Sequence, residues 1–210
     1  MELGGHSPVM IFKDADIEAA VKHCAAGKFR NAGQVCISPT RFFIEEPVYD
    51  EFIKSFKSHV EAINVGDGLD SKSTMGPLVA DRRLEVMEDF ISDAISSGGE
   101  VISGGGRGQS PGSFFEPTLI RDVPDTAKIM IEEPFGPVAP SASFSSIDEI
   151  IERANSLPFG LASYAFTSNP RTSQILKSEI ESGMLAINSM HIHSVETPFG
   201  GLKHSGYGYE

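Results

Sequence analysis

Helical and strand-like patterns alternate along this chain, and that alternation constrains its fold more than any other feature. Apolar residues recur at helical spacing in five segments, at 17–29, 48–64, 80–97, 146–155 and 170–181. Strand patterns lie between them, at 41–45, 101–102, 161–166 and 184–188. Because helices that connect parallel strands cover the faces of the sheet, this order favours an α/β fold, a mostly parallel twisted sheet flanked by helices.

The length and charge narrow the classes of protein further. A chain of 210 residues, 40% of them hydrophobic, can bury one full core, and we expect residues 1–210 to form a single domain. With 17 Lys and Arg against 29 Asp and Glu, the net charge of −12 repels phosphate backbones and anionic lipids. No apolar run approaches the roughly 20 residues that a membrane span needs, and the first residues do not resemble a signal peptide. We therefore expect a cytoplasmic protein with no nucleic-acid or membrane partner.

The two cysteines have different surroundings. Cys24 lies on the apolar face of the helix predicted at 17–29, where a thiol is buried and unreactive. Cys36 follows Ala32 and Gly33, which should end that helix, so we expect Cys36 in a loop. Two cysteines with no CxxC pair argue against a disulfide framework or a structural zinc site. Reactive groups are often displayed on loops held by a scaffold, which makes Cys36 the candidate nucleophile.

The glycine-rich stretch at 104–113 suggests a phosphate-binding loop, because such loops can surround phosphates with backbone N–H groups. Neither the dinucleotide-binding glycine pattern nor the Walker A pattern fits its spacing. We predict an ordinary surface loop there.

Four segments, in order, resemble the signature motifs of the aldehyde dehydrogenase superfamily, in its C-terminal catalytic domain. They are Met-Glu-Leu-Gly-Gly at 1–5, Phe-Arg-Asn-Ala-Gly-Gln-Val-Cys at 29–36, Glu-Glu-Pro-Phe-Gly-Pro-Val at 132–138, and Asn188 followed by Pro-Phe-Gly-Gly-Leu-Lys-His-Ser-Gly at 198–206. Together they extend over essentially the whole chain. In its motifs the chain is most similar to succinate-semialdehyde dehydrogenases.

The resemblance implies a catalytic role for Cys36 and for Glu2. In the family the cysteine thiolate attacks the aldehyde to give a thiohemiacetal, which loses hydride to NAD or NADP and becomes a thioester. Glu2 is then the general base that activates the water for hydrolysis. The backbone N–H of Cys36 supplies one donor to the tetrahedral oxygen, while the family's second donor, an asparagine, has no counterpart among these residues.

For the cofactor, the resemblance implies that Glu133 accepts hydrogen bonds from the nicotinamide ribose and that Phe135 helps to hold the ring. The dinucleotide-binding domain and the C-terminal oligomerisation tail of the family are expected to be absent from residues 1–210. We therefore expect most of the NAD or NADP, with NAD favoured, to be bound outside this chain, and the chain alone to be inactive or nearly so. A homodimer or homotetramer is expected for the parent enzyme.

The substrate contacts implied by the resemblance are Arg30 and Ser194, which match positions that contact the substrate carboxylate in succinate-semialdehyde dehydrogenases. Arg can bind a carboxylate through two parallel hydrogen bonds. Val35 and Ile37 flank the thiol and are expected to shape the pocket for a small aldehyde, a carboxylated semialdehyde such as succinate semialdehyde. The alternative, that Arg30 is a helix-end cation and Ser194 a loop hydroxyl, stays open.

Two other functions compete with the leading one. Cys36 paired with His191 or His193 would make a thiol hydrolase that needs no nicotinamide, and a remnant without chemistry would be an interaction module. No metal-ligand spacing surrounds either histidine. His6 departs from the family, in which Lys is frequent at that position. Glu2 lies so near the chain start that we expect nothing to hold it in place.

Overall fold

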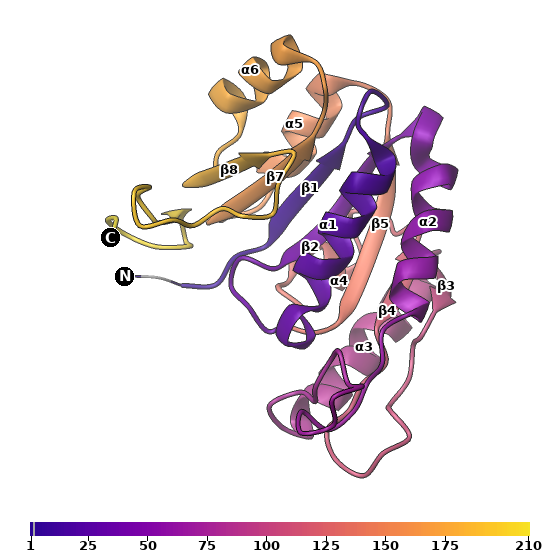
Figure 1. The fold of residues 1–210 in the computed structure, drawn as a ribbon. Coiled ribbons are helices and arrows are strands. Elements are labelled where there is room, and N and C mark those ends of the chain that lie inside the picture. The colour runs from indigo at the N-terminus through magenta and orange to yellow at the C-terminus, as the bar shows by residue number, and fades with distance from the viewer. Residues whose placement is uncertain (2) are drawn as a thin grey trace.

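A computed structural model describes residue 1 and residues 3–210, and its centre is a single seven-stranded sheet within that part of the chain (Figure 1). The strand order is β3-β4-β5-β2-β1-β7-β8. All neighbours pair in parallel except β3 and β4, so the predicted fold class is confirmed. The strands are β1 Ser7–Ile11, β2 Pro39–Glu45, β3 Glu100–Ser103, β4 Thr118–Arg121, β5 Val138–Phe144, β7 Ala162–Phe166 and β8 Met184–Ile187, and a separate short pair joins β6 Phe159–Gly160 to β9 Leu202–Lys203.

Helices cover both faces of this sheet. The connection from β1 to β2 moves toward the β3 edge of the sheet, whereas the connections from β5 to β7 and from β7 to β8 move toward the β8 edge. Because crossovers between parallel strands are right-handed, this places α1 and α2 on one face and α5 and α6 on the other (Figure 1). The helices are α1 Ile17–Phe29, α2 Tyr49–Glu61, α3 Arg82–Ser96, α4 Lys128–Ile131, α5 Ile147–Asn155 and α6 Pro170–Glu179, with 3₁₀ turns η1 Arg30–Gly33 and η2 Glu46–Val48. Side-chain oxygens cap the N-termini of α1, α5 and α6.

The five predicted helices are confirmed, as are the four predicted strands. The central strands β1 and β5 were not predicted, because they carry Pro8 and Pro140 and are buried on both faces, which removes the alternating pattern. Short elements β4 and α4 were also not predicted. Ile95, in the last turn of α3, is 52% exposed although it continues the apolar spacing of the helix.

The core between α1, α2 and β2 is rich in phenylalanine. Phe56 packs with its ring centroid 5.2 Å from that of Phe42 and 5.4 Å from that of Phe52. Such tilted aromatic pairs add to the stabilisation that burying their area provides. Cys24 lies in this layer, fully buried, and burial raises the pKa of its thiol, in agreement with the predicted structural role.

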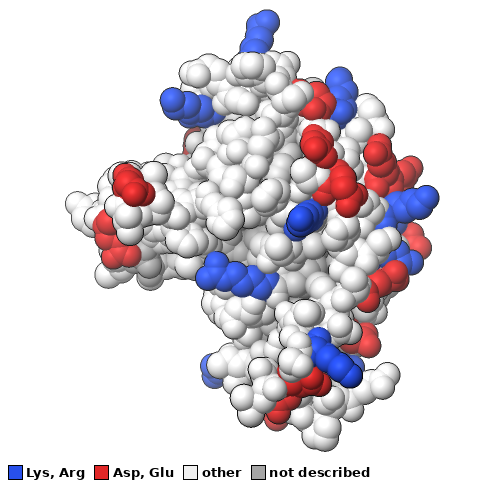
Figure 2. All heavy atoms as spheres, in the orientation of Figure 1, with Lys and Arg blue, Asp and Glu red and all other residues white. Residues whose placement is uncertain are grey.

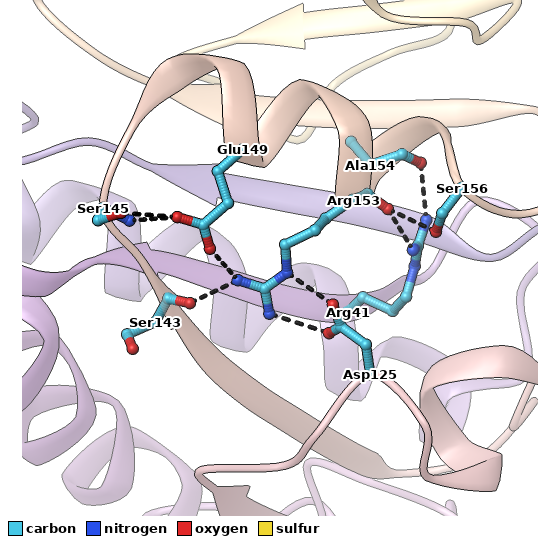
Figure 3. Close-up of polar contacts among 8 residues, drawn as sticks. All are labelled: Arg41, Asp125, Ser143, Ser145, Glu149, Arg153, Ala154 and Ser156. Atoms are coloured by element: carbon cyan, nitrogen blue, oxygen red, sulfur yellow. Dashed lines mark hydrogen bonds and ion pairs between the residues drawn. The ribbon is translucent and has the colours of Figure 1, made fainter.

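A polar network joins the sheet to α5 (Figure 3). Arg41 of β2 is only 3% exposed and donates to the carbonyls of Arg153 and Ala154 at 3.0 Å and of His6 at 3.3 Å. Arg153 in turn donates to Asp125 through two nitrogens, at 2.7 and 2.9 Å. The buried guanidinium therefore fixes the end of α5 against β1 and β2.

The surface matches the acidic composition. On the face shown in Figure 2, Lys and Arg stand singly among Asp and Glu and form no continuous basic field. In the described part of the chain, no helix has the length and apolar character required to cross a membrane. The stretch at 104–113 is irregular, as predicted for a surface loop.

Candidate active site

Three of the four signature motifs lie where neighbouring parallel strands begin, whereas Asn188 of the fourth follows the end of β8. Gly5 precedes β1, Cys36 precedes β2, Gly136 precedes β5 and Leu161 precedes β7. Because β5, β2, β1 and β7 are adjacent and parallel, their first residues lie along one edge of the sheet. The topology therefore brings together segments that are far apart in sequence.

Glycines allow these segments to approach closely. A Cβ on Gly5 would lie 2.9 Å from the Cys36 carbonyl oxygen and 3.2 Å from Leu161 Cβ. A Cβ on Gly4 would collide with the Glu133 carboxylate, and one on Gly33 with the Gly136 carbonyl. The glycines beside Glu2, the turn before Cys36 and the Glu133 loop are thus in mutual contact, which only residues without a side chain permit.

The turn that carries Cys36 has unusual backbone geometry. Asn31, Ala32 and Gly33 all adopt positive φ, at 50°, 53° and 72°. Left-handed residues in succession end α1 abruptly and redirect the chain into β2. Gln34 stabilises the turn, since its side-chain oxygen accepts from the Val79 N–H at 2.8 Å. Cys36 is half-buried in the loop that follows, as predicted.

Glu133 lies at the centre of the contact region. Its carboxylate is half-buried and accepts a hydrogen bond from the Gly5 N–H at 3.2 Å. Burial raises the pKa of Glu133, while the Gly5 N–H, Lys28 and Arg83 act to lower it. Phe135, two residues on, is 36% exposed and has a φ of 42°. The side chain of Arg83 donates to the carbonyls of Pro134 and Phe135 and so fixes this loop.

Glu2, the expected general base, lies outside the described residues. Its neighbours are held in place: the Leu3 N–H donates to the Ser205 carbonyl at 3.0 Å, and the Tyr207 N–H donates to the Met1 carbonyl at 3.2 Å. The residues on both sides of Glu2 are therefore held by hydrogen bonds, whereas the expectation for Glu2 itself concerns a residue outside the described part of the chain. The hydrogen-bonding partners lie in and just beyond the fourth motif, at 198–206.

A small cavity beside the thiol loop unites three of the four predicted substrate residues. Its volume of about 30 Å³ is that of roughly one water molecule, and it is lined by Gly27, Arg30, Val35, Ile37, Ser38, Pro39, Tyr164 and Met190. Buried Tyr164 donates to the Ile37 carbonyl at 2.7 Å. Burial and the charge of Cys36 raise the pKa of Tyr164, and Arg30 lowers it, so all three groups act within one site. Tyr164 and Met190 were not among the predicted site residues.

Ser194 does not line that cavity. It is exposed, and its N–H donates to the Thr197 hydroxyl at 3.2 Å. His191 and His193 are exposed as well, and neither imidazole ring hydrogen-bonds to any residue that the structure describes. The pairing required for a Cys36–His hydrolase is therefore not formed with either ring. Across the described positions, no cluster of three or more His, Cys, Asp or Glu is arranged to hold a metal ion.

Comparisons with known proteins agree with this geometry. The model of the aldehyde dehydrogenase family matches residues 1–210, and the chain belongs to that family. It is 42% identical over 210 residues to 4-(hydroxymethyl)benzenesulfonate dehydrogenase of Comamonas testosteroni and 40% identical to the NADP(+) succinate-semialdehyde dehydrogenase of Escherichia coli, with 100% of this chain and 44% of each relative covered.

Solved structures show the same relation. The succinate-semialdehyde dehydrogenase of Burkholderia pseudomallei superposes with a TM-score of 0.98 at 39% identity, over 100% of this chain and 43% of that one. The chain thus spans less than half the length of the relatives it matches.

Proposed function

We propose that this chain is the catalytic domain of an enzyme that oxidises a carboxylated semialdehyde to the acid with NAD or NADP, through a thioester on Cys36. The observation that carries the proposal is the contact of three motif segments at one edge of the sheet, with Gly5 against both Cys36 and Glu133. Catalytic and cofactor-binding groups must lie this close for chemistry at one carbonyl.

Cys36 performs the covalent steps in this proposal. Its thiolate attacks the aldehyde carbon to form a thiohemiacetal, while its own backbone N–H donates to the developing oxyanion. After oxidation, water attacks the thioester carbonyl, Glu2 takes the proton from that water, and the acid leaves as the Cys36 sulfur regains its charge. Tyr164 holds the loop through Ile37, which fixes the direction of attack.

The residues present fit the nicotinamide half of the cofactor. Glu133 is half-buried, ionisable and anchored by the Gly5 N–H, so it can accept from two adjacent ribose hydroxyls. Phe135 offers a partly exposed aromatic surface beside it. The bound nicotinamide supplies a hydride acceptor. The remainder of the cofactor would be held by a segment outside these residues, and a homodimer or homotetramer is our expectation for the whole enzyme.

Arg30 supports an anionic substrate. It lines the cavity next to the thiol loop, and its planar guanidinium suits a carboxylate. The names of two relatives carry an anionic substrate group, a carboxylate in succinate semialdehyde and a sulfonate in 4-(hydroxymethyl)benzenesulfonate. Ser194 is a second contact in our proposal that requires the 191–197 loop to move toward Arg30.

The decisive experiment uses the whole enzyme that contains this chain and follows reduction of NAD or NADP with succinate semialdehyde. C36A should abolish turnover, whereas C24A, which changes the buried cysteine, should retain it. R30M should lower kcat/KM for succinate semialdehyde by about 100-fold and leave that for butanal nearly unchanged, because only the first carries a carboxylate. Equal losses for both aldehydes would contradict the substrate assignment.

The same material tests the competing functions. Hydrolysis of amides by Cys36 without a nicotinamide would favour the thiol hydrolase. An interaction module without chemistry predicts that Cys36 is alkylated no faster than Cys24 in the folded chain, which mass spectrometry can measure. Our proposal predicts much faster alkylation of Cys36, because Cys24 is fully buried.

A further inference from the structure

Lys28 is a buried cation that the proposed mechanism does not use. It stands one residue before the end of α1, is 0% exposed, and its Nζ has no hydrogen-bond partner among the described residues. Burying an ammonium without a partner costs several kcal/mol. An opposite charge near Lys28 would offset this cost.

The carboxylate that acts electrostatically on Lys28 is Glu133. The end of α1 touches the loop of Glu133 through glycines, since a Cβ on Gly33 would meet both the Gly136 carbonyl and, at 3.3 Å, the Lys28 carbonyl. Each charge acts on the other: Lys28 lowers the pKa of Glu133, and Glu133 raises the pKa of Lys28. The two groups are therefore electrostatically coupled across the site.

Other charged groups around the pair do not replace Lys28. His6, from the segment before β1, has its pKa lowered well below the usual range by burial and by Arg41 and Lys28, so it is neutral. Arg41 of β2 is engaged with backbone carbonyls. Arg83 of α3 acts on Glu133 as well, but its side chain donates to the carbonyls of the adjacent loop. Arg83 keeps one buried nitrogen, Nε, without a partner among the described residues, but the Nζ of Lys28, which carries all the donors of its ammonium, has none there.

We propose that Lys28 is a positioning residue whose buried ammonium keeps the Glu133 carboxylate ionised and ready to accept from the ribose hydroxyls of the nicotinamide cofactor. This inference rests on the proposed function of Glu133. Lys28 acts through Glu133 and touches neither the substrate nor the thiol.

The effect of Lys28 on Glu133 depends on pH. Burial lowers the pKa of Lys28 to about 7, so the ammonium is half charged near pH 7 and predominantly charged from about pH 6 downward. In that range its charge opposes protonation of Glu133, whose own burial favours the neutral acid. Lys28 thus extends cofactor binding toward acid pH.

A titration tests the coupling without any cofactor. In the chain labelled with ¹³C at the glutamate carboxyl carbons, the Glu133 signal is assigned by its loss in E133Q and followed by NMR against pH. In K28M the Glu133 midpoint should rise by about one pH unit, as expected when a nearby opposite charge is removed. K22M, which removes an exposed lysine of the same helix, should leave the midpoint unchanged. An unchanged midpoint in folded K28M overturns the proposal.

Binding of nicotinamide mononucleotide, which contains the nicotinamide ribose and lacks the adenosine half, tests the functional consequence. At the pH where Glu133 is half ionised in the wild-type chain, K28M should bind about fivefold more weakly, while at pH 8 the two should bind alike. Superimposable pH profiles for K28M and wild type overturn the role of Lys28. If E133Q binds as well as wild type, or if the wild type does not bind, the ribose contact itself fails, and the titration still decides the coupling.

Discussion

Arg41 and Lys28 are both cations inside the fold, yet their surroundings are opposite. Arg41 is 3% exposed and its nitrogens donate to three backbone carbonyls, of which Figure 3 shows those of Arg153 and Ala154. Lys28 is 0% exposed and its Nζ donates to no described residue. The guanidinium presents several donors in a rigid plane, so one side chain can satisfy β1 and the end of α5 together, whereas an ammonium is a compact charge on a flexible stem.

The difference separates a charge that builds the fold from a charge that serves the site. Burial lowers the pKa of Arg41 to about 10, but hydrogen bonds to backbone carbonyls offset this desolvation and let Arg41 connect elements. Lys28 lacks that compensation and lies beside the loop of Glu133. Buried charges are normally hydrogen-bonded, and exceptions to such rules are common at functional sites. Unlike Arg41, Lys28 is one of these exceptions.

The largest expected effect is that of R41M on stability. The change removes the guanidinium donors from the carbonyls of His6, Arg153 and Ala154, of which only that of Arg153 keeps a side-chain donor, the Ser156 hydroxyl, among the described residues. We therefore expect the free energy of unfolding to fall by about 3–5 kcal/mol. Urea unfolding followed by circular dichroism measures this loss. R171M, at an exposed position of α6, is the control and should lie within about 0.5 kcal/mol of wild type. A loss below about 1 kcal/mol for R41M would remove the contrast between the two cations.

K28M, unlike R41M, should raise the free energy of unfolding, by an amount that depends on pH. The pKa of Lys28 is about 7 in the folded chain against an ordinary 10.5, so the unfolded state binds the additional proton between these values. Wild-type stability therefore rises with pH from about 7 to about 10.5, and K28M should lack that rise. At pH 6 we expect K28M to be more stable by a few kcal/mol, and above about 10.5 the gain should vanish.

Urea unfolding at pH 6, 8 and 10 measures this difference. Lower stability of K28M at pH 6 would show that Lys28 contributes to the fold as Arg41 does, and would contradict our interpretation.

The smallest effect on stability is expected for an exposed arginine in a two-hydrogen-bond ion pair. Arg107 donates to both carboxylate oxygens of Glu88, at 2.6 and 2.8 Å, and the two side chains are 51% and 44% exposed. Solvent screens such a pair, so R107M should shift Tm by no more than about two degrees, and added salt should reduce even that. Thermal unfolding at low and high salt checks this, and a shift as large as that of R41M would show that hydrogen bonding outweighs burial.

Patterns in the sequence were sufficient for the helices and for the residues within motifs. The spacing of apolar residues located α1 to α3, α5 and α6, and the motifs assigned roles to Cys36 and Glu133. The strands β1 and β5 were not found, because burial on both faces and internal prolines hide their period. Tyr164 and Lys28 were not predicted either. The role of a strand tyrosine or of a lysine near a helix end depends on neighbours that only the tertiary fold brings close.

The hydrogen bonds from Leu3 to Ser205 and from Tyr207 to Met1 affect the order of assembly during synthesis. Contacts between such distant residues cannot form until the later segment has left the ribosome, and they close long loops at a high cost in entropy. The helix and strand that flank Cys36 are local and can form early. Met1 and Leu3 therefore dock onto the segment at 205–207 after the elements around Cys36 have formed.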